Sequence, residues 1–355
     1  MSAPIRVLLV APSLDITGGQ AVQAVRLVRE LSGEPEIEIS FLPMNPRLPG
    51  WVRRIPYLRT VVNFLVFVAQ LAARIRGYDI LHLFSAGYFS FLMAPAPGML
   101  MARLCGKKSI LNYRDGRAED HLRRWPLARR LARLADAIVS PSAYVAAVFG
   151  SFGFPCRTIH NIIDLDQFRY RARRRLRPVF LANRGLEPLY NVACVLRAFA
   201  RIQQRYPEAR LTVAHDGPCR RDLEALAVEL KLRHCEFVGR VPQERIVELC
   251  DQADVYLTAP DIDCMPGSLL ECFASGLPVV ATEAGGIPYM VEHERTGLLI
   301  PRNDDASLAA QAMRLLEDEE LVERITSNAR AECENYRWSR IREQWLGLYR
   351  ELMRS

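Results

Sequence analysis

The chain has 355 residues, of which half are hydrophobic and a quarter are charged, a composition that excludes a disordered protein and suits two packed domains. The nine cysteines form no Cys-x-x-Cys pair and no Cys/His cluster, which argues against a disulfide framework and against a zinc site. The net charge of +7 is concentrated in residues 1–170, which hold 21 basic and 12 acidic residues. This bias favours contact with nucleic acid or an anionic membrane, although a solvated basic face explains it equally well.

Short apolar runs alternate with helix-like stretches along the whole chain, a pattern typical of parallel sheets covered by helices. A first series of strands is expected at residues 6–11, 37–42, 80–84, 109–113, 137–140 and 157–160. A second series is expected at residues 178–182, 210–215, 236–238, 255–259, 278–282 and 297–300. The sequence therefore predicts an α/β protein with two Rossmann-like lobes, a cleft between them and a basic connection at residues 169–177.

The longest apolar run covers residues 61–73, which is too short to span a bilayer. No cleavable signal peptide follows Met1, so we expect a cytoplasmic protein. The run is typical either of a buried helix of the first lobe or of a helix lying in a membrane interface. Its flanks are basic and aromatic, comprising Trp51, Arg53, Arg54, Arg59, Arg74 and Arg76.

Two glycines, Gly18 and Gly19, follow the first strand and precede a predicted helix at residues 21–30. Glycines at such a turn let a phosphate or a sugar approach the backbone, and the helix start favours an anion. The alternative is a turn that only closes the loop. The motif is not Gly-x-Gly-x-x-Gly and no acidic residue follows the second strand suitably, which argues against an NAD enzyme.

The segment Asp261–Glu271 carries two carboxylates, Asp263 and Glu271, separated by seven residues. A tight turn between them leads into a helix that is predicted to start near Ser268. Helix starts bind phosphate, and carboxylates accept hydrogen bonds from sugar and ribose hydroxyls. The segment thus predicts a nucleotide-sugar pocket. A capping box, in which Ser268 and Glu271 only satisfy the helix start, is the alternative.

This segment, together with Ser275–Pro278 and Gly285-Gly286, resembles the donor signature of the retaining glycosyltransferases of group 1, or family 4, which have the GT-B fold. The resemblance implies transfer of a sugar from a nucleotide-diphosphate sugar, without a metal and with no cofactor besides the donor. Asp263, where the family has Glu, would then hold sugar hydroxyls, and Glu271 would hold the ribose. The turn and helix start would contact the donor through Cys264, Met265, Ser268 and Leu269.

Further matches to this family lie in the second lobe. Arg184 corresponds to the arginine that neutralises the donor diphosphate, but the lysine expected five residues later is Leu189. The segment containing Arg240 and Val241 resembles the one that holds the base, and His215–Pro218 resembles a Gly-x-Gly-Pro turn.

The resemblance also extends to the first lobe, where Gly18 and Gly19 match a donor-facing turn. Asp115 takes the place of a family histidine that faces the donor sugar, although a turn-forming Asp-Gly pair explains it as well. His121 is a second polar candidate for the acceptor side. His160–Asp164 resembles the element that ends the first lobe and is interpreted as a hinge.

The predicted lobes are residues 1–168, which bind the acceptor and receive the terminal helix 338–355, and residues 176–337, which bind the donor. We expect a glycan or lipid-linked acceptor in cell-surface polysaccharide synthesis, met at the inner membrane face. One alternative is an inactive scaffold, suggested by Leu189, Asp263 and Asp115. Another is a sugar-phosphate synthase or epimerase of the same fold. Nucleic-acid binding lacks a motif and ranks last.

Overall fold

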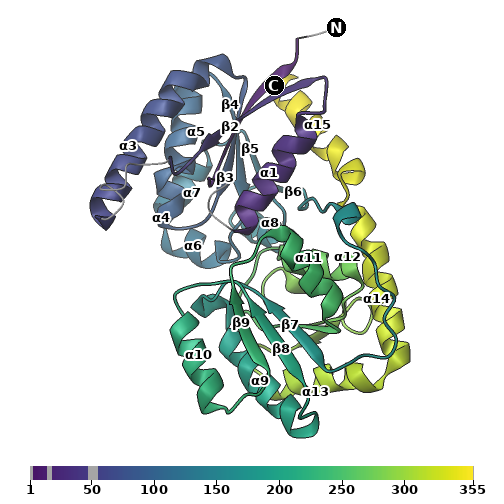
Figure 1. Cartoon of the computed structure of the whole chain (residues 1–355). Helices are drawn as coiled ribbons and strands as arrows, with labels where there is room; N and C mark the ends of the chain where they lie inside the picture. The colour runs from purple at the N-terminus through teal and green to yellow at the C-terminus, as the bar shows by residue number, and fades with distance from the viewer. Residues whose placement is uncertain (1–2, 14–17, 47–54, 355) are drawn as a thin grey trace. The chain divides into compact units, whose positions relative to one another are not determined.

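The computed structural model describes residues 3–13, 18–46 and 55–354. It consists of two compact units, Met1–Ile162 with Trp338–Ser355, and Ile163–Arg337 (Figure 1). The division falls inside the predicted hinge His160–Asp164. The first unit ends six residues before the predicted residue 168, and it includes the C-terminal helix α15 (Trp338–Arg354).

The first unit contains a six-stranded sheet with the order β2-β1-β3-β4-β5-β6 and parallel pairing throughout. All six strands were predicted, and the last is shifted toward the N-terminus by one to two residues. Their apolar sequences follow from burial of the sheet on both faces. The strands are β1 (Ile5–Ala11), β2 (Ile37–Pro43), β3 (Ile80–Ser85), β4 (Lys108–Tyr113), β5 (Ala137–Ser140) and β6 (Cys156–Thr158).

Helices α1 (Gly19–Leu31) and α15 cover one face of this sheet, where Leu27, Trp345 and Tyr349 pack on strand residues. His82 of β3 is fully buried there, with its Nδ1 2.9 Å from the Tyr349 hydroxyl. Helix α5 (Pro95–Leu104) packs against β3 and β4. The other helices among the described residues of this unit are α3 (Pro56–Arg74), α4 (Phe89–Met93), α6 (Ala118–Arg124), α7 (Pro126–Ala132) and α8 (Ala143–Ser151).

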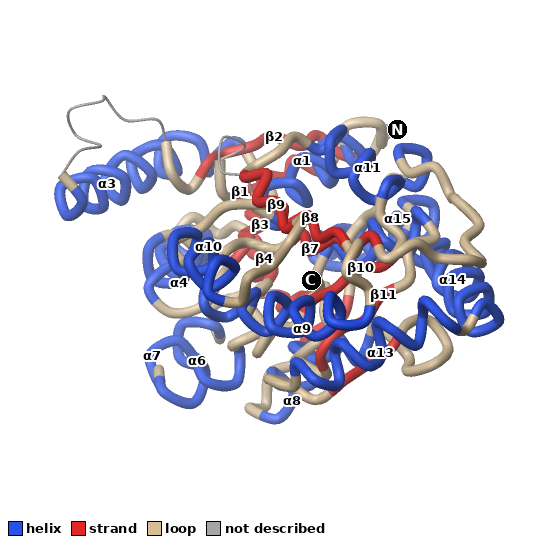
Figure 2. The backbone as a smooth tube through the Cα atoms, turned by 60° about the horizontal axis from the view of Figure 1, so that its bottom comes forward, coloured by secondary structure: helices blue, strands red, loops and turns tan. Residues whose placement is uncertain are grey.

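Helix α3 extends away from the strands of its unit (Figures 1 and 2). Phe67 and Leu71 are buried, whereas Leu58, Val61 and Leu65 are 38%, 55% and 59% exposed. The interpretation of residues 61–73 as a buried helix is therefore wrong for most of its length. The flanking Trp51, Arg53 and Arg54 lie outside the described residues.

The second unit contains a parallel six-stranded sheet with the order β12-β11-β10-β7-β8-β9. Helices α9 and α13 pack on one core cluster, α11 and α12 pack on the other, and α14 contributes to both. The strands are β7 (Val179–Asn183), β8 (Arg210–Ala214), β9 (Cys235–Gly239), β10 (Val255–Thr258), β11 (Val279–Thr282) and β12 (Leu298–Ile300). The helices are α9 (Val192–Arg205), α10 (Arg220–Glu229), α11 (Gln243–Gln252), α12 (Gly267–Ser275), α13 (Asp305–Glu317) and α14 (Glu319–Cys333).

The basic stretch at residues 169–177 is anchored in the second unit. Arg173, only 4% exposed, donates to the carbonyl oxygens of Ser275 (2.5 Å) and Cys250 (2.6 Å). The buried carboxylate of Asp254 accepts from the Arg177 backbone N–H at 2.8 Å and pairs with Arg171. Burial raises the pKa of Asp254, but its bonds to the arginines outweigh this and hold the pKa below its usual value.

Candidate active site

The carboxyl ends of β7 and β10 define the switch point of the second sheet, because β8 and β9 extend to one side of β7 and β10 to the other. Ligands of open parallel sheets bind at such points. Arg184 directly follows β7, and Asp263 lies in the loop that follows β10. The sequence separates them by 79 residues, and the fold brings them into an ion pair between Arg184 Nη2 and Asp263 Oδ2.

Arg184 is held from two sides. Its guanidinium lies 4.1 Å from the centroid of the Tyr190 ring, and its side chain is 14% exposed. Burial lowers the pKa of Arg184, but Asp263 and, to a smaller extent, Tyr190, Tyr256 and Glu271 together raise it more, so the guanidinium stays charged. Its buried Nε has no hydrogen-bond partner among the described residues. The guanidinium therefore has one N–H donor that its ion pair with Asp263 leaves unused.

Asp263 is fixed through its backbone as well as its carboxylate. Its Oδ1 accepts from the Cys264 N–H at 2.8 Å, and its carbonyl accepts from the Gly286 N–H at 3.0 Å. Gly285 has a φ of +55°, and a Cβ there would lie 2.3 Å from the Asp263 carbonyl oxygen. Only glycine allows this approach, so the Gly-Gly turn after β11 positions the Asp263 loop.

Helix α12 begins at Gly267 with Pro266 as its N-cap, so Ser268 is not the capping residue and the capping-box alternative is wrong. The Ser268 hydroxyl accepts from the Tyr256 hydroxyl at 2.9 Å. The side chains of Cys264, Met265 and Leu269 are buried. These three side chains are therefore not exposed to a ligand in this conformation, and their contact with the donor stays a prediction.

Glu271, in the middle of α12, faces the start of α11. It is 9% exposed, and its Oε1 accepts from Gln243 Nε2 at 3.0 Å. Gln243 is the first residue of α11 and directly follows Arg240, Val241 and Pro242. The fold therefore brings Glu271 close to the segment that the sequence assigned to the base.

His215 is a candidate whose own role the sequence analysis missed. Register pairs Asn183 with Ala214 and Ala214 with Gly239, so Arg184, His215 and Arg240 follow three adjacent strands. His215 has a φ of +91°, and its N–H donates to the Gly239 carbonyl at 2.7 Å. Burial lowers the pKa of His215, and so do the charges of Arg184 and Arg240. The sequence signal that could have identified His215 is its place at the first glycine of the family's Gly-x-Gly-Pro turn.

Leu189, at the position of the family lysine, lies in the loop between β7 and α9. Its carbonyl accepts from the Asp261 N–H at 2.9 Å, so the two loops at the switch point are joined. Its half-buried side chain is apolar and adds no charge.

In the first unit, Gly18 has an extended backbone with a φ of −175°, and α1 begins at Gly19. A Cβ on either glycine would meet nothing within 4 Å, so neither packing nor φ requires glycine there. Residues 14–17 of this loop lie outside the described residues. A ligand-facing role for Gly18 and Gly19 stays a prediction.

Asp115 follows β4 and forms a turn. Its carboxylate accepts from the backbone N–H groups of Arg117 (2.9 Å) and Gly87 (3.1 Å) and pairs with Arg117 Nη2 at 2.8 Å. Burial raises the pKa of Asp115, but Arg117 outweighs this and holds the pKa low. The turn interpretation of Asp115 is thus confirmed, and its contact with a sugar stays a prediction.

His121 is fully buried among Tyr88, Phe91, Tyr113 and Trp125. Its Nδ1 lies 2.9 Å from the Tyr113 hydroxyl, and burial lowers its pKa to about 4. A side chain without exposed surface cannot touch an acceptor in this conformation. His121 therefore serves the core of the first unit.

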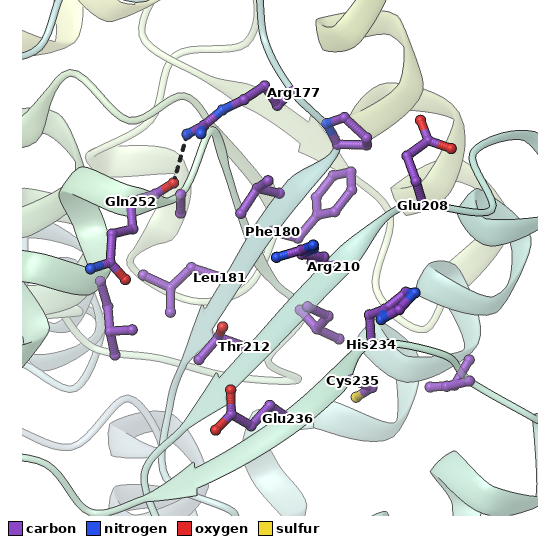
Figure 3. Close-up of a pocket in the computed structure, with 16 residues that line it drawn as sticks. Arg177, Phe180, Leu181, Glu208, Arg210, Thr212, His234, Cys235, Glu236 and Gln252 are labelled. Atoms are coloured by element: carbon purple, nitrogen blue, oxygen red, sulfur yellow. Dashed lines mark hydrogen bonds between the residues drawn. The ribbon is translucent and has the colours of Figure 1, made fainter.

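A concave region of about 900 Å³ lies at the opposite end of strands β7–β9, next to Arg177, Arg210 and His234 (Figure 3). Arg177 donates there to the carbonyl of Gln252 at 3.0 Å. Arg210 begins β8, and Arg177 and His234 lie just before β7 and β9, whereas Arg184, His215 and Arg240 follow the carboxyl ends of these strands. The region is thus separate from the switch point. The described residues contain no cluster of three or more His, Cys, Asp or Glu side chains suited to a metal.

Solved structures with this architecture are GT-B glycosyltransferases. HepE of Anabaena, determined with UDP and glucose, aligns with a TM-score of 0.77 over 97% of this chain and 99% of its own, at 18% identity. Sucrose-phosphate synthase of Thermosynechococcus elongatus gives a TM-score of 0.80 over 98% and 99%, at 20% identity. The protein therefore has the GT-B fold.

Family matches cover most of the sequence. Residues 17–167 match Glycosyltransferase Family 4, and residues 167–332 match Glycosyl transferases group 1. The chain belongs to the group 1 glycosyltransferase family and carries its enzyme domains.

Two curated relatives illustrate the similarity. The sulfoquinovosyl transferase of Arabidopsis thaliana is 29% identical over 60% of this chain and 44% of its own length. The N-acetyl-alpha-D-glucosaminyl L-malate synthase of Bacillus anthracis is 28% identical over 56% and 54%. The chain thus spans about half the length of these relatives.

Proposed function

We propose that this protein transfers a sugar from a nucleotide-diphosphate sugar to a glycan or lipid-linked acceptor, with retention of configuration, in the assembly of a cell-surface polysaccharide. The observation that carries the proposal is the Arg184–Asp263 pair at the switch point, beside the start of α12. HepE was determined with UDP and with UDP-glucose, which supports a nucleotide-sugar donor. An amylovoran biosynthesis glycosyltransferase of Erwinia amylovora, 38% identical over 35% of this chain and 32% of its own length, supports the polysaccharide role.

In this proposal the donor diphosphate lies against Arg184 and the start of α12. Arg184 supplies a permanent positive charge, and the helix start supplies unpaired N–H groups. His215 and Arg240 follow the neighbouring strands and extend this anion site. Such groups stabilise the charge that develops on a leaving diphosphate without requiring a metal ion.

The two acidic residues hold hydroxyl groups in this scheme. Asp263 binds the sugar and Glu271 binds the ribose, next to the base segment that ends at Gln243. The acceptor hydroxyl attacks the anomeric carbon on the face that the diphosphate leaves. The bond from that carbon to the phosphate oxygen breaks, a bond to the acceptor oxygen forms, and the departing phosphate oxygen takes the acceptor proton. No carboxylate nucleophile is needed.

A thermal-shift screen with UDP, GDP, ADP and their sugars tests the donor site. Because a ligand that binds only the folded state raises the melting temperature, we expect a shift with one nucleotide. The shift should be lost in Glu271→Ala and kept in Glu236→Ala, an exposed acidic control in the region of Figure 3. No shift with any nucleotide would overturn the proposal. Nuclear magnetic resonance of the product then tests retention through its anomeric configuration.

A further inference from the structure

We propose that helix α3 lies on the surface of an anionic membrane, with its outward apolar residues in the boundary between headgroups and acyl chains. We call these residues the outer stripe, and they are Leu58, Val61, Leu65, Ala69 and Ala72. The three larger side chains are 38%, 55% and 59% exposed, and both alanines are exposed. Spacings of three and four residues place all five on one side of a helix.

The polarity of α3 is the reverse of that expected for a helix that faces water. Phe67 and Leu71 are buried on the side that packs toward α5. The uncharged polar residues Thr60, Asn63 and Gln70 are half-buried instead of lying in the outer stripe. An exposed apolar surface of this kind marks an interaction site.

The helix is placed to lie on a membrane and not to cross it. Residues Leu58–Gly77 are long and apolar enough for a membrane span by length and composition. However, Phe67 and Leu71 are already packed in the first unit, and the chain continues through the short helix Ile75–Gly77 into the fully buried strand β3. A transmembrane position would remove β3 from the centre of its sheet. A surface position leaves the sheet intact.

The charges around the stripe favour anionic lipid over a second copy of the chain. Exposed arginines stand at both ends, Arg59 at one and Arg74 with Arg76 at the other, and residues 55–78 contain no Asp or Glu. Two copies packed through this face would bring arginines together in either orientation, since parallel and antiparallel pairs both juxtapose like charges. Anionic headgroups would instead neutralise both ends.

The neighbouring helix α5 has the same character. Leu100 and Leu104 are 48% and 78% exposed, and Arg103 between them is exposed as well. The whole segment of residues 1–170 holds nine more basic than acidic residues. Apolar contact and a positive field together are the two signals that stable surface binding needs. Neither depends on the donor site, so this inference stands apart from the proposed transferase function.

Vesicle flotation tests the inference with the full chain. Vesicles of phosphatidylcholine alone are compared with vesicles that also contain phosphatidylglycerol. We expect binding to the anionic vesicles that weakens with salt. The variant Leu58→Ser/Val61→Ser/Leu65→Ser should lower the partition coefficient about tenfold or more. Arg59→Glu/Arg74→Glu should lower it on the anionic vesicles.

Matched controls distinguish the effect of the outer stripe from the effect of removing exposed apolar or charged side chains elsewhere on the protein. Val25→Ser/Val228→Ser removes exposed apolar groups on α1 and α10, and Arg221→Glu reverses an exposed charge on α10; both variants should bind like the unaltered chain. The melting temperature of the stripe variant should not fall, because its side chains face outward. Its nucleotide-induced thermal shift should match that of the unaltered chain. Failure of the proposed donor site can therefore be distinguished from failure of the proposed membrane contact.

Three outcomes would overturn the inference. One is undiminished flotation of the stripe variant, and another is absence of binding to either kind of vesicle. The third is a dimer in sedimentation velocity that the stripe variant dissociates, without vesicle binding. That result would assign the surface to a second copy of the chain.

Discussion

Arg184 and Asp263 form an ion pair at the switch point of the second sheet, through Arg184 Nη2 and Asp263 Oδ2. The family resemblance implies that Arg184 binds the diphosphate and that Asp263 binds the sugar. Because they share an ion pair, the charge that binds phosphate also orients the carboxylate that is proposed to bind hydroxyls. Tyr190 stacks on the same guanidinium, so the three side chains form one unit.

The contributions of Arg184 and Asp263 to the free energy of unfolding should be strongly coupled. Arg184→Ala leaves a nearly buried carboxylate without its cation, so the free energy of unfolding should fall by about 3–5 kcal/mol. In a double-mutant cycle with Asp263→Ala, measured by urea unfolding, the double variant should lose less than the sum of the single variants. The more exposed pair Arg201–Asp305 is the control and should couple by less than about 1 kcal/mol. Simple additivity for Arg184 and Asp263 would contradict the prediction.

The missing lysine can be restored at Leu189. Leu189→Lys adds a cation at the position that neutralises the diphosphate in the family, so nucleotide affinity should rise about tenfold and become more salt-sensitive. Isothermal titration of UDP, GDP and ADP measures this, with Leu189→Met as the uncharged control. A gain in transferase activity would favour an enzyme over the scaffold alternative. Unchanged affinity would show that Leu189 does not face the phosphates.

Two substitutions of His215 distinguish the effect of its backbone conformation on stability from the effect of its imidazole ring on nucleotide binding. His215→Gly removes the strain of a positive φ in a residue that carries a Cβ, so it should stabilise the fold by up to about 1 kcal/mol. His215→Ala keeps this strain. Both remove the imidazole beside Arg184, so both should weaken nucleotide affinity by a similar factor. Thermal unfolding and nucleotide titration of each variant check this. If His215→Gly binds nucleotide as the unaltered chain does, the ring has no part in the anion site.

The first unit should lose stability in acid through His82. Burial, and then the charge of Arg114, lowers the pKa of His82 to about 3, whereas an unfolded histidine titrates near 6.5. Between these values the unfolded chain binds a proton that the folded chain does not. The free energy of unfolding should therefore fall as pH falls through this window, by up to about 1.4 kcal/mol per pH unit.

Tryptophan fluorescence is suited to this measurement, because all four tryptophans lie outside residues 163–337 and Trp345 lies 4.8 Å from His82, ring centroid to centroid. His82→Gln should reduce the pH dependence to the smaller part that buried His121 contributes, and the exposed control His234→Gln should leave it unchanged. An equal slope in His82→Gln and the unaltered chain would refute the assignment.

The Asp254 cluster should stabilise the second unit. Asp254→Asn removes the charge that offsets Arg171, Arg177 and the buried Arg173, so unfolding should become easier by about 3–5 kcal/mol. Arg174→Ala breaks an exposed pair with Glu323 and should cost less than about 1 kcal/mol. Far-ultraviolet circular dichroism during chemical unfolding measures both. Equal effects would show that Asp254 contributes no more than a surface pair.

The sequence by itself determined the local features of this protein. Strand runs such as residues 109–113 and 278–282 are short and apolar, a pattern that indicates burial on both sheet faces. The structure has all twelve predicted strands, with ends within two residues of the predicted ones. The segment around Asp263 and Glu271 also predicted the start of a helix, because turn residues followed by an apolar run are a local signal of a helix N-terminus.

The tertiary structure alone decided which of these pieces meet. The pairing of Arg184 with Asp263 depends on β7 lying beside β10, and that strand order results from packing of the whole sheet. The same long-range packing gives His215 its left-handed backbone, buries Arg173, and leaves Leu58, Val61 and Leu65 outside the core. Periodicity predicts that a helix has an apolar face, but only the neighbouring elements determine whether that face is covered.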